Sequence, residues 1–272
     1  MEYLFDPGNW EWVITGNNFQ FLLEGFLINL EIAAIGIVFS LVFGLLLALM
    51  RISNSRLISV PAGIWVDLWR NIPLILMILY LGLFAVPTSW GRAWADNVPE
   101  WFPEALQDEL VLGAILALIL YNSAVLCEIM RSGILSLDRG QREAAASLGL
   151  TYSQQMRFVI LPQGLRRMVP ATVSQLITLN KDTTLVTILG INEVLSHANA
   201  ITGAVFFGGV PAPILQVYLM VGVLFIAVNF TLSRISRRLE IRERQRTGTK
   251  LRRVAGLEDQ VAAETDLAGP PR

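Results

Sequence analysis

Cysteine and histidine are almost missing from this chain. It has 272 residues, of which one is a cysteine, Cys127, and one is a histidine, His197. A single cysteine cannot form an intrachain disulfide, and neither residue has the companions that a metal site needs. We therefore expect no disulfide framework, no metal site and no bound cofactor. His197 is expected to be exposed in a loop.

Charged side chains are also scarce. They make up 16% of the chain, against about 25% in an average soluble domain, while hydrophobic residues make up 54%. This composition argues against a soluble protein and predicts an all-α membrane protein. Residues 1–20 contain no lysine or arginine, so they do not resemble a secretory signal. Their tryptophans predict an extracytoplasmic or interfacial segment.

Long hydrophobic runs are what the chain does contain. A helix needs about 20 mainly apolar residues to cross the hydrocarbon of a bilayer. By that measure we expect five transmembrane helices within residues 21–240. The second would be broken, because Asn71-Ile72-Pro73 favours an interruption between 57–69 and a membrane part at 72–86. The other four are expected at 32–50 (starting near Phe21), 110–129, 168–191 and 214–232.

Lysine and arginine fall almost entirely on one side of these crossings. Of the 21, 18 lie in the loops and tail of one side and one, Arg92, on the other, with Arg70 and Lys181 inside the crossings. Cytoplasmic loops carry the basic excess. We therefore expect the N-terminus outside, the C-terminus inside and a multi-pass protein of the cytoplasmic membrane. The tail at 241–272 starts basic, which favours contact with the lipid bilayer rather than nucleic acid, and then becomes disordered.

Two local patterns predict packing within the membrane. Small residues recur every four positions along the first crossing and would let another helix approach closely. They are Gly36, Ser40, Gly44 and Ala48, which we call the small-residue stripe. Glu128 and Arg131, three residues apart, are expected to pair on one helix face.

The polar stretch at 131–167 predicts two short helices between the third and fourth crossings. Each helix would open with a capping box. The two boxes are Asp138 with Gln141 and Thr151 with Gln154. Gly149 can take a positive φ and end the first helix, and Pro162 is expected to end the second. We therefore expect a helix–turn–helix on the cytoplasmic side.

Five short motifs follow one another along the chain. They are Arg70-Asn71-Ile72-Pro73-Leu74; Glu128-Ile129-x-Arg131-x-Gly133-Ile134; Arg139-Gly140-Gln141; Glu143-Ala144-Ala145 with Gly149 and Ile160-Leu161-Pro162; and Lys181-Asp182-Thr183-Thr184-Leu185-Val186. The fourth matches the EAA loop of bacterial ABC importer permeases. Over about residues 20–240 the chain resembles the polar amino-acid branch of that family, the histidine/glutamine/glutamate/arginine type. It also looks similar to actinobacterial glutamate permeases.

The resemblance implies the ABC type I importer permease fold, with 131–167 as its coupling loop. The sequence has no Gly-x-x-x-x-Gly-Lys-Ser/Thr motif, so we expect no ATPase site and no catalytic residue of its own. ATP would be bound by a separate ATPase dimer. The residues expected to couple to it are Glu143, Ala144, Ala145, Ser147, Leu148, Gly149 and Pro162.

Charges inside the predicted crossings suggest where a substrate binds. Lys181 lies 14 residues beyond Arg167, about 21 Å along a helix, so Lys181 and Asp182 fall within the membrane. They could meet the carboxylate and ammonium of an amino acid, or they could pair within the protein. Arg70, beside the broken helix, could join this site or reach the cytoplasmic interface. The candidate substrate-binding residues are Arg70, Lys181, Asp182, Thr183, Thr184, Asn29 and Gln175.

The sequence therefore predicts the permease subunit of an ABC importer for a polar L-amino acid. Glutamate or glutamine is favoured, because the cations Arg70 and Lys181 outnumber Asp182. There are two alternatives, a permease for arginine or histidine and a stand-alone secondary transporter. A membrane enzyme would need a catalytic set of residues that the predicted spans lack. The expected partners are the ATPase dimer, an identical or related second permease joined through the small-residue stripe or the fifth crossing, and an extracytoplasmic binding protein docking on 88–108 and 192–212.

Overall fold

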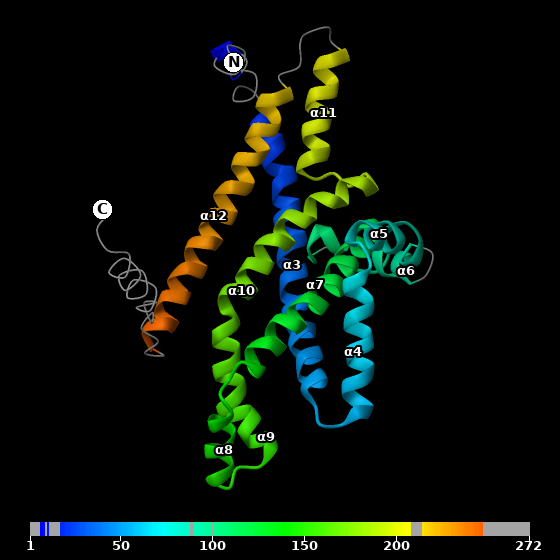
Figure 1. The fold of residues 1–272 in the computed structure, drawn as a ribbon. Helices are drawn as coiled ribbons and strands as arrows, with labels where there is room; N and C mark the ends of the chain where they lie inside the picture. Colours follow the sequence, from blue (N-terminus) through cyan, green and yellow to red (C-terminus); the bar gives the residue numbers. More distant parts are fainter. Residues whose placement is uncertain are drawn as a thin grey trace, which may run out of the picture.

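The computed structural model describes residues 6–8, 10, 17–87, 90–99, 101–207 and 214–246. Within these ranges all regular elements are helical, which confirms the predicted all-α class (Figure 1). Most of the N-terminal segment 1–20 lies outside the described residues, as does the tail beyond 246. The predictions of an interfacial segment and a disordered tail therefore stay predictions.

Three helices among the described residues are long and apolar enough to cross a membrane. They are α3 (Asn18–Ile52), α7 (Glu109–Leu135) and the Ile214–Leu239 part of α12 (Ile214–Arg246). α12 continues well past the apolar stretch, as expected for a last crossing that extends into a basic segment. These helices correspond to the first, third and fifth predicted crossings.

The second predicted crossing is broken where the sequence indicated. α4 (Arg56–Asn71) ends before Pro73, and α5 (Leu74–Tyr80) runs on into the π-helical turn η1 (Leu81–Ala85). The two halves meet at 95°. Ile72 takes extended backbone (ψ 128°), the conformation that a following proline favours. The bent pair counts as a fourth span only if its two halves are taken together.

The fourth predicted crossing has a different form. α10 (Leu161–Asp182) is long enough to span, but its many polar residues keep it below the apolarity of the three long helices. It passes at Thr183 into the 3₁₀ helix η4 (Thr183–Leu189), which ends at Gly190 with φ 75°. The described chain thus has three spans, or four with the bent pair. The predicted number of five and the predicted orientation are not confirmed.

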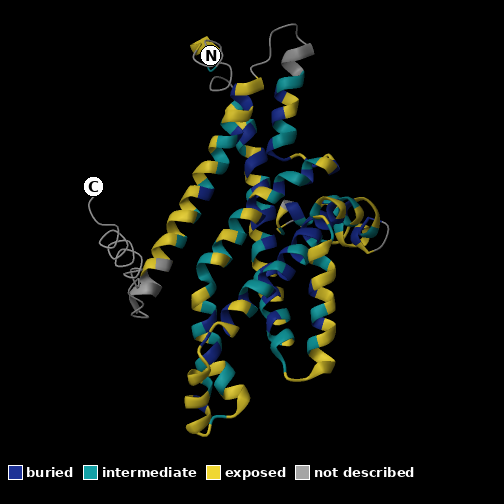
Figure 2. Ribbon diagram, viewed as in Figure 1, coloured by how far each residue is buried: buried dark blue, intermediate teal, exposed yellow. Residues whose placement is uncertain are grey.

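The core forms where α3 crosses α7, and buried residues concentrate there while exposed ones run along α12 (Figure 2). All four residues of the small-residue stripe are buried, as predicted. A Cβ on Gly44 would lie 2.9 Å from the Cβ of Leu126 in α7. The stripe therefore packs inside the chain and is not free to join a second permease, which corrects one of the two predicted interfaces.

Short helices complete the fold. α6 (Gly91–Ala95) and η2 (Glu104–Leu106) precede α7, and α8 (Arg139–Ser147), α9 (Tyr152–Gln155) and the π turn η3 (Met156–Ile160) precede α10. α8 and α9 lie at the end of the molecule opposite α11 (Val194–Phe207) (Figure 1). α11 occupies most of the stretch 192–212, so the loop predicted around His197 is a helix.

Candidate functional site

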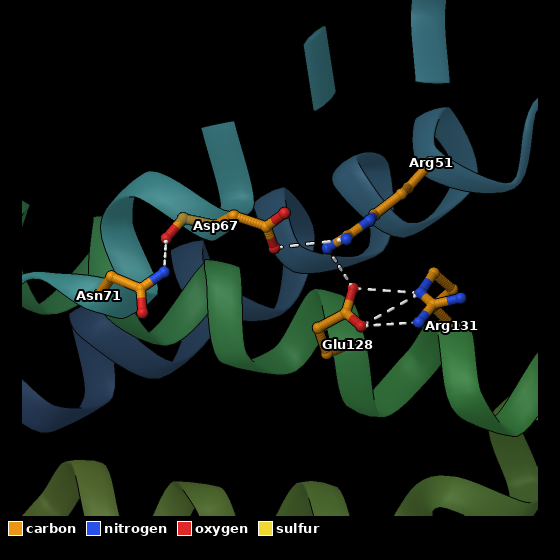
Figure 3. Close-up of polar contacts among 5 residues, drawn as sticks. All are labelled: Arg51, Asp67, Asn71, Glu128 and Arg131. Carbon is orange, nitrogen blue, oxygen red and sulfur yellow. Dashed lines mark hydrogen bonds and ion pairs between the residues drawn. The ribbon is translucent and has the colours of Figure 1, made fainter. Parts of the chain in front are cut away.

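A network of ion pairs ties together the helices that frame the candidate site (Figure 3). Arg51 at the end of α3 contacts Asp67 of α4 at 3.3 Å and Glu128 of α7 at 2.6 Å. Glu128 also binds Arg131 at 2.8 Å, so the predicted pair is present. Asn71 donates to the Asp67 carbonyl at 2.6 Å and holds the end of α4 just before the break. The network fixes α4 against α3 and α7.

Two of the candidate substrate-binding residues are buried in a second polar cluster. Asn29 donates to the Thr183 hydroxyl at 3.2 Å and to the Glu193 carboxylate at 3.1 Å, and its own oxygen accepts from the Val194 N–H at 3.1 Å. Asn29, Thr183 and Glu193 are each 0% exposed. In this conformation Asn29 and Thr183 cannot touch a substrate. They fix the start of α11 to α3 and η4.

Glu193 was not among the sequence candidates, although it holds this cluster together. Its second carboxylate oxygen accepts from the Ser196 N–H at 2.9 Å, which is an N-cap bond at the start of α11. The prediction for His197 was wrong: the ring is partly buried and stacked on Phe21 with centroids 3.8 Å apart. Its Nδ1 lies 2.6 Å from the Phe21 carbonyl oxygen. An acidic residue directly before an apolar helix was the available signal for Glu193.

Another group of polar residues lies along one uncovered face of α10. Ser174, Thr178 and Lys181 are all exposed, and their spacing of four and three residues places them in one row. The hydroxyls donate to carbonyls one turn back, from Ser174 to Pro170 at 3.0 Å and from Thr178 to Ser174 at 3.2 Å. Their lone pairs remain available. We call Ser174, Thr178 and Lys181 the polar face of α10.

The remaining candidates surround this polar face to different degrees. Asp182 and Thr184 are half-buried at the junction of α10 and η4, and Thr184 donates to the Lys181 carbonyl at 2.8 Å. Among the described residues no ion pair joins Lys181 to Asp182, as expected for neighbours on a helix. Gln175 donates to Asn122 of α7 at 2.9 Å and is tied to the helix behind it.

Arg70 lies at the end of α4, directly before the break. It is exposed, and no carboxylate lies within 4.0 Å of it in the part of the chain that the structure describes. The neighbouring Asp67 is engaged with Arg51 instead. Arg70 is therefore a cation that the described chain leaves available for an anionic group.

The predicted turn between α8 and α9 is present, and it depends on Gly149. This residue has φ 77°, in the left-handed region that glycine enters most easily. Gly149 N–H donates to the Ala146 carbonyl at 2.9 Å, and Leu150 N–H donates to the Ala145 carbonyl at 3.3 Å. These are the two bonds of a Schellman motif, which ends α8 sharply.

Of the two capping boxes predicted for this loop, one forms and one does not. The capping box of Thr151 and Gln154 is present, with the Thr151 N–H donating to Gln154 Oε1 at 2.9 Å. The box predicted for Asp138 and Gln141 does not form, because the Asp138 carboxylate accepts from the nearer Gly140 N–H at 2.9 Å.

Pro162 does not end the second helix. The chain stays helical from α9 through η3 into α10, and the proline sits in the first turn of α10. A proline there needs no N–H partner, and the wide π turn before it relaxes the usual clash with the preceding helical turn.

The tip of the loop presents the residues predicted for coupling. Glu143, Ala144 and Ser147 are exposed, Ala145 is buried against the loop, and Pro162 is exposed at the start of α10. Leu148, directly after α8, is 80% exposed. Within the described ranges no group of three or more histidine, cysteine, aspartate or glutamate side chains could hold a metal ion.

Known proteins are similar to this chain in sequence and in fold. Residues 19–245 match the family described as "Binding-protein-dependent transport system inner membrane component". The chain is 39% identical over 223 residues to the probable glutamine ABC transporter permease protein GlnP of Bacillus subtilis (strain 168), covering 82% of this chain and 94% of that one. It is 31% identical over 234 residues to the arginine transport system permease protein ArtQ of the same organism, covering 85% and 98%.

A solved structure is similar along most of the chain. It is the crystal structure of an amino acid ABC transporter with histidines, at a TM-score of 0.65 and 25% identity, covering 84% of this chain and 94% of that one. The chain therefore has the same overall fold as that transporter's chain.

Proposed function

The chain belongs to the family of binding-protein-dependent transport system inner membrane components, whose relatives above are amino-acid ABC permeases, and we propose that it carries glutamine or glutamate inward. Family membership also makes it a protein of the inner membrane and does not favour a stand-alone secondary transporter. The proposal concerns what this chain carries, which residues line its route and which subunits it works with.

The observation that carries the proposal is the polar face of α10. The long helices α3 and α12 expose apolar side chains such as Phe39 and Phe230, as lipid-facing helices do. α10 exposes Ser174, Thr178 and Lys181 instead. Polar groups at membrane depth are costly unless they face water or a polar partner. We infer that this face lines the route of the substrate.

Two charges at the end of that face suit a zwitterion. Lys181 offers an ammonium to the substrate carboxylate, and Asp182 offers a carboxylate to the substrate ammonium. Lys181 and Asp182 are consecutive residues at the end of α10, so their side chains leave the helix about 100° apart and do not pair with one another. Arg70, exposed beside the broken helix, is a second cation for an acidic or amide side chain.

The proposed preference for glutamine or glutamate is based on these charges and on one relative. Arg70 and Lys181 outnumber Asp182, which favours glutamate or glutamine over a cationic amino acid. The relative GlnP is named for glutamine, whereas ArtQ is named for arginine. A permease for basic amino acids is therefore the second candidate, supported by the ArtQ similarity.

The partner subunits follow from the family and from the loop tip. We propose that a dimeric ATPase supplies the energy, that a binding protein delivers the substrate and that a second permease completes the pathway. Leu148, 80% exposed beside the Gly149 turn, is the side chain best placed to enter a groove on the ATPase. Glu143 and Ala144 lie exposed on the same short helix, α8. The chain would have no ATPase site itself.

Uptake of labelled amino acids tests the proposal. Cells with and without this chain are given labelled glutamine, glutamate or arginine in separate experiments. We expect uptake of glutamine or glutamate that depends on the chain, and no such uptake of arginine. Chain-dependent uptake of arginine alone would establish the second candidate instead, and the absence of chain-dependent uptake of all three would refute both.

A further inference from the structure

An apolar groove lies between α3, α7 and the segment around α6. Its volume is about 350 Å³, within the range of roughly 300–1,000 Å³ that ligand pockets occupy. α3 contributes Phe39 and Phe43, α7 contributes Leu116, and the α6 segment contributes Trp90 and Trp94. All its lining residues are aliphatic or aromatic. The indole N–H of Trp94 donates to the Leu106 carbonyl at 2.9 Å.

A polar pocket of about 370 Å³ lies close to the groove, because its residues Ala95 and Gln107 directly follow the groove residues Trp94 and Leu106 in the chain. It uses the other side of the same two elements, with Arg92 and Asp96 from the α6 segment and Asp108 and Glu109 from the start of α7. Arg92 lies only two residues from each of the groove tryptophans. Its side chain is 70% exposed, and its Nε lies 3.4 Å from a Glu109 carboxylate oxygen, so it is held loosely.

The two cavities together have the chemistry of an amphipathic ligand. The groove walls belong to two helices that are long and apolar enough to span a membrane, so hydrocarbon chains can reach it. Tryptophans beside it are typical of the boundary between hydrocarbon and headgroups. The pocket combines one cation with several carboxylates, which matches a headgroup that carries both a phosphate and an ammonium.

We propose that this pair of cavities binds one glycerophospholipid with an ethanolamine headgroup. Its acyl chain would fill the apolar groove beside Phe43 and Leu116. Its phosphate would contact Arg92, and its ammonium would lie beside Asp96 and Glu109. The site is separate from the polar face of α10 and does not depend on the substrate that the chain carries.

Photolabelling with a lipid probe tests the site directly. The full chain, purified with the subunits that accompany it, is placed in phosphatidylcholine vesicles. One set of vesicles contains a small amount of phosphatidylethanolamine with a diazirine on one acyl chain, the ethanolamine probe. A second set contains phosphatidylglycerol with the same diazirine-bearing chain, the glycerol probe. After illumination, mass spectrometry maps the labelled residues. We expect the ethanolamine probe to label groove residues of α3 and α7 preferentially, and the glycerol probe to label them less.

Three variants make the result specific. Leu116→Trp fills the groove and should abolish its label. Val223→Trp is the control, because Val223 is 55% exposed on α12 outside the groove and should leave the label unchanged. Asp96→Asn should remove the preference for the ethanolamine probe while acyl labelling continues, because this carboxylate lies beside the ammonium that phosphatidylglycerol lacks. Equal labelling by both probes, spread over α3 and α12, would refute the site. So would an unlabelled groove that crosslinks to a second permease instead.

Discussion

Replacing Gly149 by valine should uncouple the permease from its ATPase without affecting membrane insertion. Gly149 has φ 77°, and the left-handed region costs an L-residue about 1–2 kcal/mol, more when its side chain is β-branched. If the turn escapes this strain by changing shape, it gives up two Schellman hydrogen bonds worth roughly 1 kcal/mol each. Either way the equilibrium between the native turn and altered forms of it shifts by about tenfold or more against the native turn.

The expected phenotype is selective, because the added side chain meets nothing inside the chain. No atom outside the turn lies within 4 Å of a Cβ built on Gly149. Membrane abundance should therefore be normal, while co-purification with the ATPase and ATP-driven uptake should fall. All three are measured side by side for each variant.

Two matched variants separate strain from bulk. Gly149→Asn adds a side chain that tolerates the left-handed region, and it should retain most of the uptake. Gly222→Val makes the same change in α12, where φ is not positive and nothing lies within 4 Å of the new Cβ, and it should retain full co-purification with the ATPase. Normal uptake by Gly149→Val would show that the loop is only a connector.

Three further variants test other parts of the account. Asp182→Asn should leave assembly intact but lower transport by about tenfold, because a charge-assisted contact of roughly 1.5–3 kcal/mol is lost; wild-type transport would make Asp182 structural. Glu128→Ala removes the carboxylate that Arg51 and Arg131 share, so it should reduce the free energy of unfolding by about 1–3 kcal/mol and lower the thermal unfolding midpoint in detergent. Asp67→Ala, at the more exposed end of the network, should reduce it by at most about 1 kcal/mol. Leu148→Glu should reduce ATPase co-purification at unchanged membrane abundance, and undiminished co-purification would remove Leu148 from the docking surface.

Local features were predictable where one residue's chemistry decides the outcome. Pro73 breaks the second crossing because it lacks an N–H and restricts Ile72. Gly149 ends α8 because only glycine takes φ 77° without strain. The small-residue stripe is buried because small side chains let helices approach closely. Each of these effects acts over a few residues or along one helix face.

Features that depend on distant partners were not predictable. Arg51 counted only as a basic loop residue in the sequence, yet it binds Glu128, 77 positions away. Asn29 and Thr183 were chosen as ligands, yet they hydrogen-bond one another across 154 positions. Only the packing of α3, α7 and α10 reveals these arrangements.

The most direct test of the central claim is transport by the purified complex in vesicles. The chain, its ATPase and its binding protein are reconstituted, labelled glutamine and the binding protein are supplied on one side, and ATP on the other. The account predicts that glutamine accumulates only when ATP and the ATPase are both present, and that the Gly149→Val complex does not accumulate it. Accumulation without ATP, or equal accumulation by the Gly149→Val complex, would contradict the account.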